Sequence, residues 1–119
     1  MARRVLLGST LAWLAATPAL AHAIIVESSP AVNATVAGPE LDIALRFNSR
    51  IDRARSSLTL NAPQKPADKP QTLPLVGDSP DLLKAHASGL APGAYSLRWQ
   101  VLSVDGHITR GDIPFKVAR

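Results

Sequence analysis

The side chains best suited to chemistry in this chain are its three histidines, His22, His86 and His107. His107 follows Asp105 at a spacing of two, with Gly106 between them. On extended backbone, this spacing places a carboxylate and an imidazole on the same side, where both can bind one metal ion. Imidazole suits copper, zinc and nickel, and a nitrogen-rich tetragonal ligand set favours Cu(II). Alternatively, Asp105-Gly106 forms a type I′ hairpin turn and His107 only flanks it.

His22 gains a second metal-binding group if it becomes the first residue of an exported protein. Residues 1–21 are typical of a secretory signal peptide, with two arginines near the start, an apolar run and a small-residue cleavage site. The apolar run of about 12 residues is shorter than the roughly 20 that a membrane span needs. Cleavage after Ala21 would leave His22 with a free α-amine, so that amine and imidazole could chelate one ion. Cleavage after Ala23 would remove His22, and the sequence leaves this alternative open.

These residues predict one metal site, formed by the α-amine and imidazole of His22, the imidazole of His107 and the carboxylate of Asp105. Two donors on one residue lower the entropic cost of assembling the site. An α-amine has an ordinary pKa of about 7.7 to 8.0, so metal binding should weaken as the medium becomes acidic. His86 lies on a candidate strand and is expected to be a surface or edge histidine rather than a ligand. No catalytic residue and no organic cofactor are predicted.

The elements that must position these residues are short strands, because apolar and polar residues alternate with a period of two. The clearest strands are predicted at 41–47, 95–101 and 113–117, and weaker ones at 24–28, 56–60, 71–76 and 82–86. Pro, Gly, Asn and Asp separate them. Seven short strands predict an all-β fold, an antiparallel sandwich or barrel of immunoglobulin-like or cupredoxin-like size. The proline-rich stretch 63–74 is expected to be an exposed loop or an edge.

Composition excludes several classes of protein. The chain has no cysteine, so it can form neither a disulfide nor a thiolate metal site. Its net charge of +4 falls to +2 once Arg3 and Arg4 leave with residues 1–21, and the other basic residues are scattered. Nucleic-acid binding is therefore not expected. Residues 22–119 contain no second hydrophobic span, so we expect one mature domain without a membrane anchor.

Four segments carry a resemblance to a known family: 22–31 (HAIIVESSPA), 45–47 (LRF), 90–107 (LAPGAYSLRWQVLSVDGH) and 115–117 (FKV). In these segments the mature chain resembles the CopC family of periplasmic copper-binding proteins. The resemblance implies a seven-stranded Greek-key β-barrel or sandwich that binds one Cu(II) ion per chain through His22, Asp105 and His107. It also implies a periplasmic role in copper resistance, handling or delivery, with a CopD-like inner-membrane protein as partner. We expect a monomer that is not an enzyme.

The chain departs from the family pattern in two places. Some members add a glutamate ligand after the Leu-x-Phe strand, where this chain has Asn48 and Ser49. Other members hold Cu(I) in a methionine-rich loop, whereas the only methionine here is Met1. Thioether ligands suit Cu(I), so we expect a single site that favours Cu(II) and loses affinity when the copper is reduced.

Two other functions stay open. An N-terminal histidine beside a second histidine is also the copper site of lytic polysaccharide monooxygenases, so a copper-dependent oxidative enzyme with a histidine-brace-like site is an alternative. Asp105 in the ligand set argues against it, because its carboxylate would fill a position that oxygen needs. The third possibility is a metal-free interaction module in which His22 and His107 are incidental.

Overall fold

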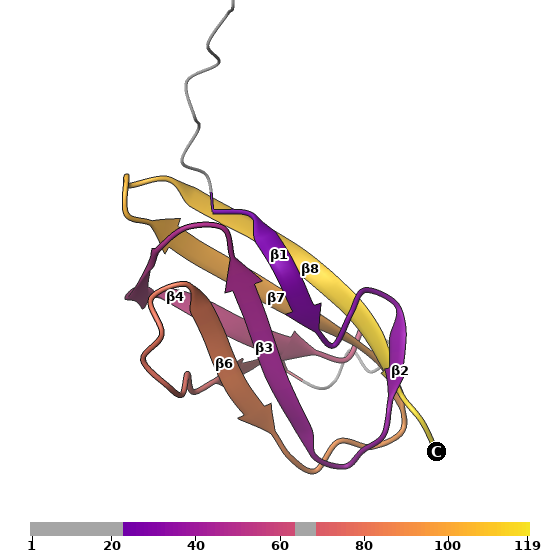
Figure 1. The fold of residues 1–119 in the computed structure, drawn as a ribbon. Coiled ribbons are helices and arrows are strands. Elements are labelled where there is room, and N and C mark those ends of the chain that lie inside the picture. Colours follow the sequence, from indigo (N-terminus) through magenta and orange to yellow (C-terminus); the bar gives the residue numbers. More distant parts are fainter. Residues whose placement is uncertain (1–22, 64–68) are drawn as a thin grey trace, which may run out of the picture.

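The computed structural model describes residues 23–63 and 69–119, which form two β-sheets packed face to face (Figure 1). One sheet has three strands in the order β1-β3-β6, and the other has five in the order β2-β8-β7-β4-β5. The strands are β1 (Ile25–Ser29), β2 (Ala34–Val36), β3 (Leu41–Phe47), β4 (Ile51–Asn61), β5 (Gln71–Leu73), β6 (Leu82–Ala87), β7 (Gly93–Ser103) and β8 (Ile108–Val117). The predicted all-β sandwich is confirmed. No helix in the described ranges is long and apolar enough to span a membrane.

The predicted strand count of seven is wrong by one, since the described residues contain eight strands. The additional strand is β2, whose three residues pair in parallel with the end of β8. Three residues are too few to show a period of two, and their pairing depends on a strand far along the chain. Strand β8 also begins at Ile108 and not at residue 113 as predicted. The prediction missed the first half of this strand because Gly111 interrupts the alternation of apolar and polar side chains there.

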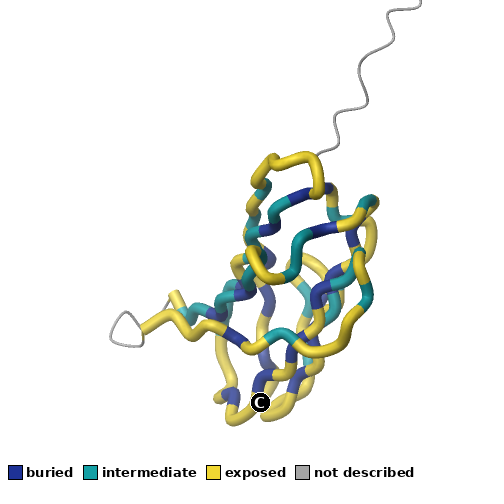
Figure 2. Tube along the Cα trace, turned by 90° about the vertical axis from the view of Figure 1, so that its left-hand side faces the viewer, coloured by how far each residue is buried: buried dark blue, intermediate teal, exposed yellow. Residues whose placement is uncertain are grey.

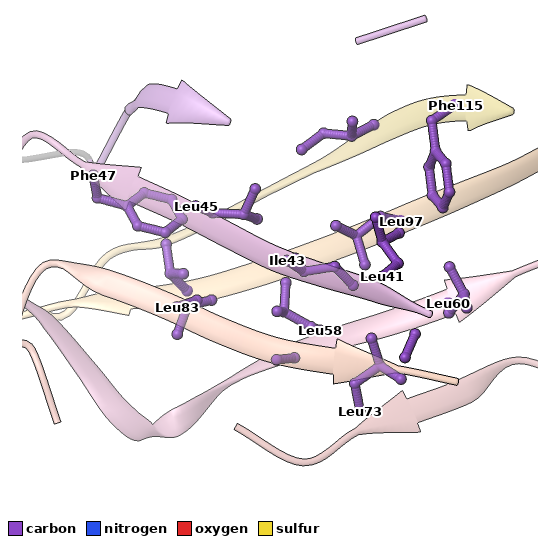
Figure 3. Packing of buried hydrophobic residues seen from close by; sticks show 14 of the residues in the cluster. Leu41, Ile43, Leu45, Phe47, Leu58, Leu60, Leu73, Leu83, Leu97 and Phe115 are labelled. Carbon is purple, nitrogen blue, oxygen red and sulfur yellow. The ribbon is translucent and has the colours of Figure 1, made fainter. Parts of the chain in front are cut away.

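The core lies between the two sheets, where buried positions alternate with exposed ones along the strands (Figure 2). In β3 the burial follows the predicted alternation, and its apolar side chains point toward the five-stranded sheet (Figure 3). Phe47 meets Trp99 edge to face, with ring centroids 5.4 Å apart. Burying apolar surface in this way is the main stabilising contribution to the fold. The labelled core residues are Leu41, Ile43, Leu45, Phe47, Leu58, Leu60, Leu73, Leu83, Leu97 and Phe115.

The longest ladder joins β7 to β8 and runs without interruption from the Gly93–Val117 pair to the Leu102–Ile108 pair. Its connecting loop carries Asp105 and His107 to one end of the sandwich (Figure 1). Residues 64–68 of the proline-rich stretch lie outside the described residues. Further along this stretch, Gln71–Leu73 form β5 at the edge of the five-stranded sheet. This agrees with the second of the two expected alternatives, an exposed loop or an edge.

Candidate metal centre

The loop between β7 and β8 fixes the spacing of the two predicted ligands. The amide N–H of Ser103 donates to the carbonyl oxygen of His107 at 2.9 Å, and the amide N–H of Gly106 donates to that of Ser103 at 2.9 Å. Gly106 has a φ of 91°. A β-turn followed by glycine at positive φ is the usual three-residue hairpin loop. The suggested type I′ turn is therefore wrong, since it needs positive φ at Asp105 as well, and Asn33 alone has this among the described non-glycine residues.

Asp105 and His107 are in direct contact within this loop. Oδ2 of Asp105 lies 2.8 Å from Nδ1 of His107, and Oδ1 accepts a 3.2 Å hydrogen bond from the His107 amide. Oδ1 also accepts a hydrogen bond from the hydroxyl of Ser103, the one buried polar residue of the described chain. The hydrogen bond from Ser103 and those from His107 lower the pKa of Asp105 to about 2. Asp105 is therefore ionised at neutral pH, as a metal ligand must be.

The distance between these two side chains fits a shared metal ion. Ligand atoms about 2.0 to 2.1 Å from one ion and at right angles to each other lie about 2.9 Å apart. Asp105 Oδ2 and His107 Nδ1 are 2.8 Å apart, so they can take neighbouring positions of a tetragonal centre. In a second arrangement Nε2 of His107 binds the ion while Asp105 orients the ring through Nδ1. Both side chains reach solvent, with 58% of His107 exposed, so an ion can approach.

His22, the third predicted ligand, lies outside the described residues, but the residue that follows it does not. Ala23 is buried, and its carbonyl oxygen accepts a 3.0 Å hydrogen bond from Oγ1 of Thr109. Thr109 is two residues after His107 in the chain. The main chain at Ala23 is thus fixed beside the start of β8, at the end of the sandwich that carries the β7–β8 loop.

Asn48 holds the same segment from the other side. Its Oδ1 accepts a 2.9 Å hydrogen bond from the amide of Ile24, and its own amide donates to the carbonyl oxygen of Ile24 at 2.9 Å. The side-chain oxygen of Asn48 is therefore engaged by the main chain of Ile24. The backbone of residues 23–24 is held by Asn48 and Thr109 together.

The structure separates the third histidine from this site. His86 lies on β6 in the three-stranded sheet, as expected for an edge histidine, and contacts Asp42. Residues 23–63 and 69–119 contain no group of three or more His, Cys, Asp or Glu side chains arranged to hold one metal ion. The described part of the site is thus the Asp105–His107 pair.

Three residues around the site have roles that the sequence analysis did not assign: Ser103, Thr109 and Asn48. A signal existed for the first two, because Ser103, Asp105, His107 and Thr109 follow one another at a spacing of two. No local signal marks Asn48, whose contact lies 24 residues away.

Comparison with known proteins places these features in a family. The model of the CopC domain matches residues 25–118. The chain is 34% identical over 105 residues to Protein YobA of Escherichia coli (strain K12), covering 85% of this chain and 83% of that protein. It is 32% identical over 112 residues to Copper resistance protein C of Xanthomonas campestris pv. juglandis, covering 89% of this chain and 87% of that protein.

Solved structures agree with this assignment. The crystal structure of CopC from Methylosinus trichosporium OB3b matches with a TM-score of 0.70 and 30% identity, over 82% of this chain and 94% of that one. The crystal structure of PcoC from Escherichia coli, described as a methionine-rich copper resistance protein, matches with a TM-score of 0.66 and 25% identity, over 81% and 98%. With a family model that covers most of its length, this chain belongs to the CopC family.

Proposed function

We propose that the chain is a periplasmic Cu(II)-binding protein that holds one ion with His22, Asp105 and His107. The observation that carries the proposal is the hydrogen bond between Thr109 and Ala23. This bond holds Ala23, the residue after His22, beside Thr109, which follows His107 by two residues in the chain. Membership of the CopC family supports copper as the ion, since one relative is named a copper resistance protein.

The donor set suits Cu(II). The α-amine and imidazole of His22, the imidazole of His107 and the carboxylate of Asp105 supply three nitrogens and one oxygen, and such a set favours tetragonal Cu(II). The amine exists only after removal of residues 1–21, so export creates the site. Acid releases the ion, because the nitrogen donors bind metal only when deprotonated.

The proposed site prefers Cu(II) to Cu(I). The sequence contains one methionine, Met1, which leaves with the leader. Without thioether ligands the mature chain has no donors of the kind that soft Cu(I) prefers. Reduction then weakens binding and provides a route for release to a CopD-like inner-membrane partner, in copper resistance or delivery.

We propose a monomeric binding protein rather than an enzyme. The carboxylate of Asp105 is held beside His107 by hydrogen bonds to Ser103 and to the His107 amide. A carboxylate fixed there fills a coordination position that an oxygen-activating copper site keeps open. The mature protein with copper and a reductant should therefore consume no more oxygen or peroxide than free copper does, and Asp105→Ala tests whether removing the carboxylate opens such activity.

The test begins with the intact mass of the exported protein, which shows whether His22 is the first residue. Titration of that protein with Cu(II) should then give a visible d–d band that saturates at one equivalent. A single alanine added before His22 should weaken binding sharply and leave the fold intact, and His107→Ala should do the same. His86→Gln is the matched control, because it removes an imidazole from the other sheet and should leave the first equivalent unchanged.

Three results would contradict the proposal. Absence of a band at one equivalent, with the N-terminus confirmed, refutes the copper site. Equal affinity after the added alanine excludes the α-amine as a ligand. A Cu(I) affinity equal to or tighter than the Cu(II) affinity overturns the preference for Cu(II).

A further inference from the structure

A second group of a histidine and carboxylates lies on the three-stranded sheet. His86, on the edge strand β6, is paired across the ladder with Asp42 of β3, and Glu40 lies two residues before Asp42. Nδ1 of His86 is 2.8 Å from Oδ1 of Asp42, and Nε2 is 3.5 Å from Oε2 of Glu40. Figure 1 shows the end of β6 and the start of β3 at the end of the sandwich away from the β7–β8 loop.

The two ring nitrogens of His86 therefore face two different carboxylates. Asp42 accepts a hydrogen bond from Nδ1–H of His86, because an ionised carboxylate can only accept, and this bond fixes the ring and directs the other nitrogen toward Glu40. Histidines that bind metals commonly have this arrangement, with one ring N–H donated to a carboxylate and the other nitrogen on the ion. The contact between Asp42 and His86 thus supplies the orienting half of a metal site.

The contact between His86 and Glu40 is an ion pair when His86 is protonated, and its length also suits two ligands on one ion. A hydrogen bond from N–H to oxygen is usually about 2.9 to 3.0 Å long. Nitrogen and oxygen ligands about 2.0 to 2.1 Å from a tetrahedral ion lie about 3.3 Å apart. The observed 3.5 Å is nearer to the second value. A small movement of either exposed side chain would place both atoms on a shared ion.

We propose that Nε2 of His86 and the carboxylate of Glu40 form a second metal site, for a tetrahedral divalent ion such as zinc, with Asp42 orienting the ring. The ion would balance the charges of the two carboxylates, and water would fill its other positions. With 49% of His86 and 59% of Glu40 exposed, the site is open and weak. It is independent of the proposed copper site and would give His86 a ligand role that the sequence analysis did not expect.

Zinc alone is the probe, and the double variant His22→Ala/His107→Ala is the parent protein, in which His86 is the sole histidine. NMR of the imidazole at neutral pH should show His86 signals that shift with Zn²⁺ and saturate at one equivalent bound. Glu40→Gln in this parent should weaken binding at least tenfold. Asp42→Asn should weaken it about tenfold, the usual cost of losing a carboxylate behind a metal-bound histidine.

Glu27→Gln is the matched control, because Glu27 belongs to the same sheet and pairs with Arg46 rather than with His86. It should leave zinc binding unchanged. The proposal is overturned if His86 shows no saturable shift up to millimolar zinc, if Glu40→Gln binds as tightly as the parent, or if Glu27→Gln weakens binding as much as Glu40→Gln does. Dispersed amide spectra verify that each variant is folded. If the zinc site is absent, the expected copper titration of the unaltered chain does not change, so the two proposals fail separately.

Discussion

Thr109 donates a 3.0 Å hydrogen bond through its hydroxyl to the carbonyl oxygen of Ala23, across 86 residues of sequence. The bond joins the first described residue of the chain to the strand that follows the β7–β8 loop. It therefore fixes the main chain at Ala23, the residue that follows the proposed ligand His22, to the strand that begins after the Asp105–His107 pair.

Replacing Thr109 by valine keeps the shape of the side chain and removes the donor. A hydrogen bond contributes about 1 kcal/mol net, so Thr109→Val should weaken Cu(II) binding by roughly fivefold. Thr109→Ser keeps the hydroxyl and should bind nearly as the unaltered protein does. Competition titration with a Cu(II) chelator measures both. Equal affinities for the valine and serine variants would show that the bond does not position the ligand.

Ser103→Ala removes the hydrogen bond that orients Asp105. Loss of such a supporting partner commonly costs 10-fold or more in metal affinity, and we expect about a tenfold weaker Cu(II) complex. The pKa of Asp105 should also rise toward its ordinary value, because the Ser103 hydroxyl is the main cause of its low pKa. Ser96→Ala, at the other end of β7, is the control for a serine deletion on the same strand. If both variants bind Cu(II) alike, the Ser103 hydroxyl does not support the site.

Gly111 lies across the ladder from Trp99 and is covered by its indole. A Cβ at this position would come within 2.7 Å of the ring, closer than real Cβ atoms approach. Gly111→Ala should therefore destabilise the fold by about 1 to 3 kcal/mol through overpacking. Denaturant unfolding of the metal-free protein measures the loss. In a Trp99→Leu background the same change should cost less, because the indole is gone, and an equal cost in both backgrounds would argue against the steric cause.

The pKa of His86 is raised above its ordinary value of 6.5, first by the hydrogen bond to Asp42 and further by the charges of Glu40 and Asp42. Desolvation opposes this shift in part, and Lys84 is the nearest cation along the same strand. Because the folded pKa is the higher one, protonated His86 stabilises the fold fully below about pH 6.5, the ordinary imidazole pKa. This contribution is lost as pH rises through the raised pKa.

An NMR titration of the His86 ring in metal-free protein checks this. The midpoint should lie above 6.5 in the unaltered chain and move down in Asp42→Asn. At low pH the unaltered chain should unfold at a higher midpoint than His86→Gln. This difference should disappear as the pH rises through the raised pKa of His86. Identical ring titrations with and without Asp42 would rule out the hydrogen bond as the main cause.

The sequence predicted those parts of the fold that depend on local pattern. In β3, each apolar residue of the alternating run is buried as expected, because the side-chain period of a strand decides which face it occupies. The same reasoning failed for β2, where three residues form a strand only because β8 lies beside them. The first half of β8 was not predicted, because Gly111 interrupts its alternating pattern. The side chain that covers Gly111 belongs to Trp99 of the neighbouring strand, and no local pattern marks that contact.

The candidate site divides in the same way. Asp105 and His107 do meet as predicted, but they meet in a three-residue hairpin loop and not on the extended backbone from which their spacing predicted the contact. Asn48 and Thr109 hold main-chain atoms of residues distant in sequence, and no local pattern marks such contacts. The carboxylates around His86 come from the neighbouring end of β3 and depend on strand register, which the sequence did not supply.

The 86-residue separation between Ala23 and Thr109 has a consequence for stability. In the proposed complex, copper links the first residue of the mature chain to the last hairpin and so closes almost the whole chain into one loop. Restricting a long loop lowers the entropy of the unfolded chain, as a disulfide does. In a domain without cysteine, the ion would act as a reversible cross-link, and a chelator would act on the domain as a reductant acts on a disulfide-bonded one.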